Sequence, residues 1–172
     1  MQSSDLQKFI DKAKKMEKGH EMDLSSGEDL SVAIMNLIGI EEHMFFTSQK
    51  LGDTKYIEVL NTAREMRKEL MKKIVKEGQG EVWCTSKHLL SASMRLMEVG
   101  TKYLTKGDNK EANAYFKKSF DLYNLFWGLN LGMVKSDPQK PKFESKDKPL
   151  PKKDFLGSIS KTIGKILDCC RE

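Results

Sequence analysis

Residues 93–126 read SMRLMEVGTKYLTKGDNKEANAYFKKSFDLYNLF and predict two helices joined by a short turn. Asp108, followed three residues later by Glu111, is a helix-start signal because the first side chain caps the helix and the second reaches back to it. The helix that follows has apolar side chains at steps of three and four residues, which predicts a core-facing stripe. The stripe consists of Ala112, Phe116, Phe120, Tyr123 and Trp127. A short turn between long helices places them antiparallel, so the stretch predicts a helical hairpin.

The same stretch resembles a single tetratricopeptide unit. The resemblance is carried by Leu96, Val99, Gly100, Tyr103, Gly107, Ala112, Phe116 and Ser119. In that family small residues let two antiparallel helices touch while large ones fill the space beside them. The resemblance implies that Gly100, Ala112 and Ser119 are packing positions, and that a groove or helix face receives a segment of a partner protein. It covers 34 of the 172 residues and departs at Asn124, where the family commonly has proline.

Helix-start signals and glycine turns divide the rest of the chain before residue 135 in the same way. Helices are predicted at residues 4–19, 25–50, 54–76 and 81–105, and a fifth from the start signal at Asp108 to about Trp127. Because the turns between the last four are short, these helices should pack antiparallel with the first beside them. The sequence therefore predicts an all-α fold, an antiparallel up-down bundle of about five helices in a domain of residues 3–134.

The composition changes after this domain. Residues 135–153 contain seven Lys, three acidic residues and all four prolines, which is typical of a solvated linker. In residues 154–170 apolar side chains return at helical spacing, at Phe155, Ile159, Ile163 and Ile166. We expect this amphipathic helix to dock on its own bundle or on a partner, which includes a second copy of the chain. An alternative is that it lies on an anionic membrane surface, with the terminal cysteine pair acylated.

Charge and cysteine content exclude several classes of function. Residues 1–134 hold 20 basic and 19 acidic residues, so bulk charge does not support a nucleic-acid-binding surface. Three cysteines form no disulfide framework, and no apolar run approaches the roughly 18 residues of a membrane span. We therefore expect a cytoplasmic protein, with peripheral membrane association as the alternative.

Two charged residues fall on apolar helix faces. At 100° per residue, Arg67 lies about 20° from Leu60, and Glu41 lies about 40° from Leu37. Counted outward from the turn at Gly52, their axial offset is about 6 Å, which an arginine side chain can span. We predict that Glu41 and Arg67 form a buried pair, either as a structural ion pair or, together with Tyr123, as a small ligand pocket.

A second candidate site is a metal centre formed by Glu41, Cys84 and His88. Cys84 and His88 are four residues apart on one helix, but two ligands do not complete a metal site. No catalytic motif is evident, and no cofactor is predicted. The sequence favours a non-enzymatic protein-interaction module with a docking tail; the alternatives are a bundle that binds a small ligand or metal, and a peripheral membrane protein.

Overall fold

The computed structural model describes residues 24–75 and 80–133, and these residues form four α-helices and no strand. The helices are α2 (Leu24–Leu51), α3 (Lys55–Ile74), α4 (Glu81–Thr105) and α5 (Asn109–Asn130). The prediction of an all-α helical bundle is therefore confirmed over this part of the chain. None of the described helices is long and apolar enough to cross a membrane.

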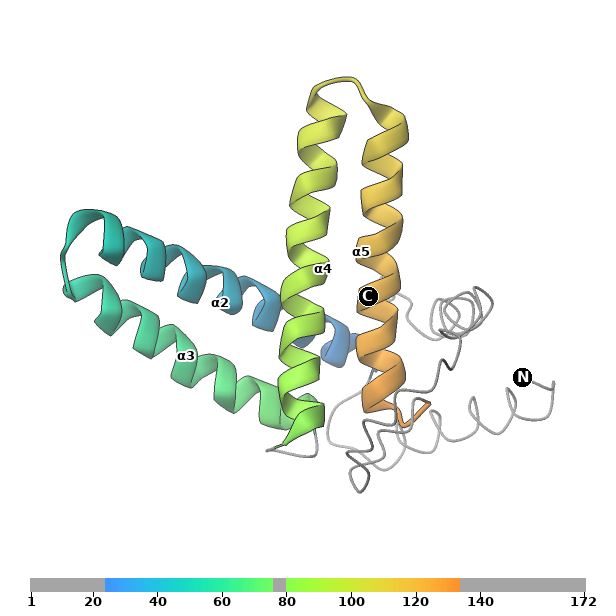
Figure 1. The fold of residues 1–172 in the computed structure, drawn as a ribbon. Helices are drawn as coiled ribbons and strands as arrows, with labels where there is room; N and C mark the ends of the chain where they lie inside the picture. The colour runs from blue at the N-terminus through green and yellow to red at the C-terminus, as the bar shows by residue number, and fades with distance from the viewer. Residues whose placement is uncertain (1–23, 76–79, 134–172) are drawn as a thin grey trace, which may run out of the picture.

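The four helices are arranged as two antiparallel hairpins (Figure 1). The first hairpin, α2 with α3, turns at Gly52, and the second hairpin, α4 with α5, turns at Gly107. Both glycines have positive φ angles, 64° and 78°, which other residues adopt reluctantly. The predicted start of the last helix is confirmed, because Asp108 Oδ1 accepts a hydrogen bond from the Glu111 backbone N–H at 3.0 Å.

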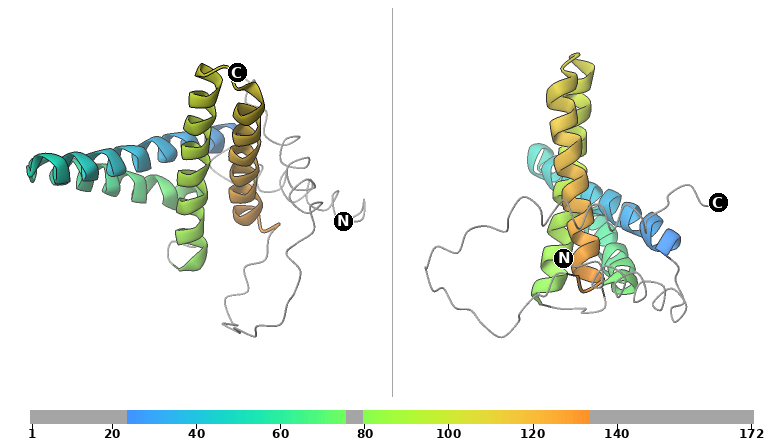
Figure 2. Two further views of the ribbon diagram at one scale, coloured as in Figure 1. Left: turned by 45° about the horizontal axis from the view of Figure 1, so that its top comes forward. Right: turned by 90° about the vertical axis from the view of Figure 1, so that its right-hand side faces the viewer.

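The two hairpins cross at a wide angle, so their turns point in different directions (Figures 1 and 2). The main contacts between the hairpins run from α2 to α4. The expectation that all the helices lie side by side in one up-down bundle is wrong for α2 to α5. Short turns determine the pairing within each hairpin, but they do not determine how one hairpin lies on the other.

The apolar core lies where the hairpins meet. It contains Ile34, Met35, Met71, Ile74, Val75, Leu90, Phe126, Trp127 and Leu131, so every described helix or its end contributes. These residues come from the beginning of α2, the end of α3, the beginning of α4 and the end of α5. We call this region the junction core. The remainder of each hairpin extends away from it.

Small residues bring the helices of the second hairpin together, as the resemblance implied. Gly100, Ala112 and Ser119 are all buried. Ser93 Oγ donates to the Ser119 carbonyl at 2.9 Å, and Ser119 Oγ donates to the Ser93 carbonyl at 2.7 Å. The apolar stripe of α5 is only partly confirmed, since Phe120 is 50% exposed.

Three predicted segments lie outside the described residues. They are the first helix at 4–19, the linker at 135–153 and the amphipathic segment at 154–170, including its apolar side chains.

Replacing Gly100 by alanine should destabilise the second hairpin. A Cβ atom there would lie 2.5 Å from the Phe116 ring, which must then move. We expect the free energy of unfolding to fall by about 1 to 2 kcal/mol, a usual cost of overpacking. Urea denaturation followed by circular dichroism measures it.

Gly39→Ala is the matched control, because a Cβ atom at this helical glycine meets nothing within 4 Å. Alanine should there raise the free energy of unfolding by about 0.5 to 1 kcal/mol through helix propensity. Equal effects of the two substitutions would contradict the close approach at Gly100.

Candidate binding groove between the two hairpins

The predicted pair of Glu41 and Arg67 is confirmed. Arg67 is 3% exposed and Glu41 15%, and the guanidinium donates from two nitrogens to the two carboxylate oxygens, with Nη2 3.2 Å from Oε2. The third nitrogen, Nη1, lies 3.6 Å from the Met71 sulfur. This two-point contact joins α2 to α3 inside the first hairpin and fixes their register.

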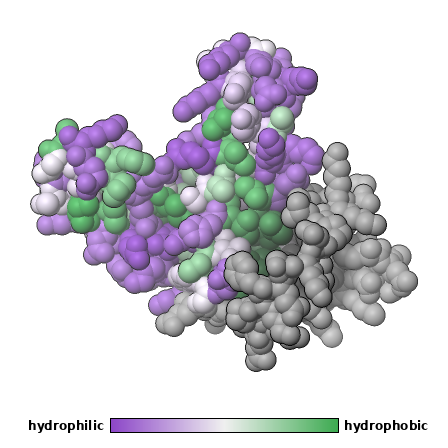
Figure 3. Space-filling view, viewed as in Figure 1, coloured by the Kyte–Doolittle hydropathy of each residue, from purple (hydrophilic) through white to green (hydrophobic). Residues whose placement is uncertain are grey.

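The first hairpin buries polar and small residues while large apolar ones remain outside. Between residues 36 and 70, which lie beyond the junction core, its buried residues are Ser48, Ala63 and Arg67. Large apolar side chains that are 42 to 64% exposed lie on the same hairpin, at Val32, Ile40, Phe45, Phe46, Leu51, Val59 and Met66. Figure 3 shows hydrophobic surface along this hairpin, among hydrophilic residues. Exposed apolar patches often mark binding regions, so the outside of this hairpin is a candidate binding surface.

Tyr123 does not join the Glu41–Arg67 pair. Its hydroxyl lies 2.7 Å from Ser31 Oγ, and Ser31 Oγ donates to the Glu28 carbonyl at 2.7 Å, so the tyrosine is the donor to the serine. Burial raises the pKa of Tyr123 above its ordinary value. The residue connects α5 to the beginning of α2, and the expected pocket of Glu41, Arg67 and Tyr123 does not form.

The expected metal centre is also wrong for the described residues. Cys84 and His88 are exposed on α4, whereas both Glu41 carboxylate oxygens are engaged by Arg67. Among residues 24–75 and 80–133, no group of three or more His, Cys, Asp or Glu side chains is placed to hold a metal ion. The spacing of four residues puts Cys84 and His88 on one side of α4, but the crossing of the hairpins brings no third ligand to them among the described residues.

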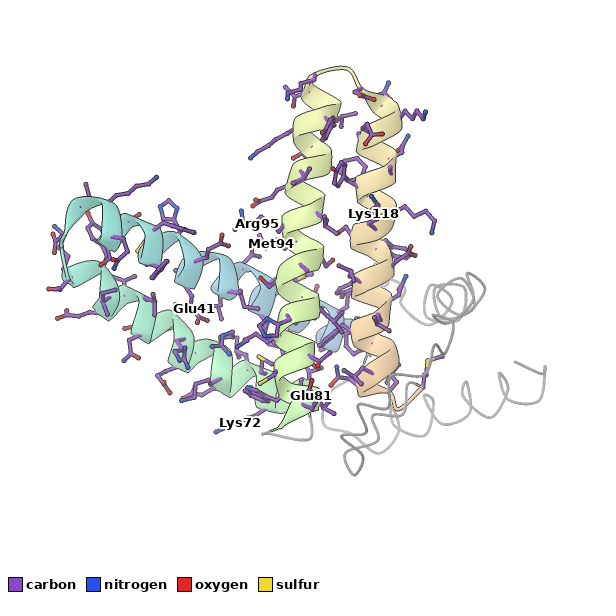
Figure 4. The ribbon with its side chains drawn as sticks, viewed as in Figure 1. Glu41, Lys72, Glu81, Met94, Arg95 and Lys118 are labelled. Carbon is purple, nitrogen blue, oxygen red and sulfur yellow. The ribbon has the colours of Figure 1, made fainter. Side chains whose placement is uncertain are left out.

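A groove of about 490 Å³ opens between α2 and α4, in the angle between the hairpins. Nine of its lining residues lie on α2 and three on α4. They are Asn36, Gly39, Ile40, Glu42, His43, Met44, Phe46, Thr47 and Lys50, with Met94, Arg95 and Glu98. Met94 and Arg95 project from α4 toward this angle (Figure 4). On α2 most of these positions recur at steps of three and four residues, which places them on the side turned away from α3.

The lining of the groove mixes apolar side chains with polar and charged ones. Ile40, Met44, Phe46 and Met94 supply the apolar surface. Arg95 pairs with Glu98 on its own helix and with Glu42 of α2, and the hydrogen bond that Arg95 donates to Glu42 raises the pKa of Arg95. Exposed pairs of this kind contribute little stability, but they set which charges an incoming segment meets.

Sequence reasoning missed the groove. The repeated spacing of Asn36, Gly39, His43 and Lys50 was visible, but a stripe of small and polar residues reads as an ordinary solvated face. This stripe becomes one side of a groove only because α4 crosses beside α2 and adds Met94.

Comparison with known proteins does not assign a family. No protein-family model matches the chain, and neither the curated proteins nor the solved structures contain a significant match.

Removing the carboxylate of Glu41 should destabilise the first hairpin strongly, because Arg67 would stay buried without its partner. We expect Glu41→Ala to lower the free energy of unfolding by about 3 to 5 kcal/mol. The double variant Glu41→Leu with Arg67→Met should recover most of that loss, since apolar residues of similar volume can replace a buried pair. Chemical denaturation of the three chains measures both effects.

Glu65→Ala provides the control, because the carboxylate of Glu65 pairs with Lys68 on the exposed side of α3. It should leave the unfolding midpoint unchanged. If Glu41→Ala were as mild as this control, the buried pair would not be what holds α2 against α3.

Proposed function

We propose that this protein is a non-enzymatic interaction module, whose groove between α2 and α4 receives an amphipathic helix of a partner protein. The observation that carries the proposal is the groove itself, which has four large apolar side chains among polar and charged ones and adjoins the junction core at Met94. Helix-in-groove recognition needs a row of apolar contacts flanked by polar ones.

The dimensions of the groove support a helical ligand. Its lining on α2 runs from Asn36 to Lys50, a length of about 21 Å at 1.5 Å per residue. Four turns of a bound helix cover this length, enough for three or four apolar side chains on one face. These would contact Ile40, Phe46 and Met94.

Two further features support protein binding. The exposed apolar side chains of the first hairpin continue beyond the groove, for example at Leu51 and Val59, and extend the surface that a partner can cover. The resemblance of residues 93–126 to a tetratricopeptide unit implies the same kind of work. A cytoplasmic location is part of the proposal, because three cysteines provide no disulfide framework.

Affinity capture from an extract of the source cells, with the full-length chain as bait, tests the proposal. Ile40 and Phe46 line the groove and are 42% and 52% exposed, so Ile40→Glu and Phe46→Glu leave the fold intact while placing a charge in the groove. Loss of one buried apolar contact should lower the affinity for the captured partner about 10- to 100-fold.

Phe120→Glu is the control, since Phe120 is 50% exposed on α5 and does not line the groove. It should capture the same partner as the unchanged chain. A set of bound proteins that both groove variants retain would contradict the proposal, and so would a partner lost equally in all three variants.

A further inference from the structure

We infer that the chain's own segment 154–170 docks as a helix in the groove between α2 and α4, where it competes with the partner. The inference rests on the proposed function because it concerns the same groove. It names the first occupant of that groove, and it makes the affinity for a partner depend on the tail.

The apolar pattern of the segment fits the groove. Phe155, Ile159, Ile163 and Ile166 follow one another at steps of four, four and three residues. On a helix they form one stripe about 16 Å long, within the roughly 21 Å of groove that α2 lines. Four apolar side chains thus meet the four apolar groove residues already described, while Lys161 and Lys165 lie on the opposite, solvated side.

The described residues end just after α5, within reach of the groove for a linker of this length. Asn130 Nδ2 donates to Ser86 Oγ at 3.0 Å, so the end of α5 lies beside the first turns of α4. Arg95 of the groove is nine residues further along α4, about 14 Å at 1.5 Å per residue. A 19-residue linker at positions 135–153 has a root-mean-square span of roughly 24 Å, so it reaches the groove without being stretched.

Tethering favours this segment over a second copy of the chain. A tether of this length holds its end at an effective concentration of about a millimolar near the groove. A separate molecule must bind at its free concentration, which is far lower for most proteins in cells. The tail is therefore the ligand that the groove meets first.

Charge does not oppose the docking. Residues 154–172 carry three basic and three acidic side chains. The groove has Glu42 and Glu98 against Lys50 and Arg95. Two surfaces without net charge bind mainly by burying apolar area, so the interaction should change little with salt.

Cysteine cross-linking of the full-length chain tests the inference. In a background of Cys84→Ser and Cys170→Ser, Cys169 marks the end of the segment. A second cysteine is placed at either end of the groove, as Asn36→Cys or Lys50→Cys, because the helix has two directions in which to lie. Both positions are exposed, so neither change should disturb the fold. Lys72→Cys, exposed near the end of α3 (Figure 4), is the control.

A short bis-maleimide should join Cys169 to one of the groove positions within a monomer. We expect this product to form about tenfold faster than with Lys72→Cys, because docking raises the local concentration. Adding Ile159→Asp and Ile163→Asp should reduce the rate to that of the control. The same two changes should strengthen capture of a groove-dependent partner.

Equal rates at all three positions would overturn the inference, and so would cross-linked dimers in place of monomers. The outcome is separable from that of the proposed function. Cross-linking without any groove-dependent partner would refute the interaction module alone, whereas groove-dependent capture without cross-linking would refute tail docking alone.

Discussion

The junction core is the contact on which the rest of the structure depends. Phe126 and Leu90 of the second hairpin are fully buried there against Ile34 and Met71 of the first. This contact holds the beginning of α2 against α4, while the far ends of the two helices diverge. The groove begins at Asn36 and Met94, one and four residues beyond the last core positions on their helices. It is therefore a direct consequence of where the core ends.

Outside the junction core, the two helices of each hairpin are held together in a different way. The second uses small residues, since Gly100 admits the Phe116 ring and two serines exchange hydrogen bonds with opposite carbonyls. The first uses the buried pair of Glu41 and Arg67, which specifies register but adds little apolar burial. Its large apolar residues are consequently available on the outside. A hairpin of this composition stabilises itself partly through its interior pair and gains further stability when its outer face is covered.

Local sequence patterns predicted the helices. The way the two hairpins cross depends on contacts between distant residues, which no local pattern encodes. Helix 81–105 was predicted with the bounds that α4 has, and the Glu41–Arg67 pair followed from helical periodicity and the nearby turn, because both partners belong to one hairpin. Tyr123 was misplaced, since its partner Ser31 is 92 residues away and meets it only when the hairpins cross. Phe120 follows the periodic stripe of α5 but lies beyond the region that the first hairpin covers. The groove was missed for the same reason, because three of its twelve lining residues belong to α4, which meets α2 only when the hairpins cross.

The crossing of the hairpins is tested most directly by the distance between their turns. Spin labels at Thr54→Cys and Lys110→Cys, in a chain whose three native cysteines are replaced by serine, mark exposed positions beside the turns at Gly52 and Gly107. Pulsed electron paramagnetic resonance measures the distance distribution between them. Crossed hairpins predict one narrow distribution centred at a long distance. A short distance would contradict the account, because in an up-down bundle both turns lie at the same end, and a broad distribution would show that the junction core does not fix the angle.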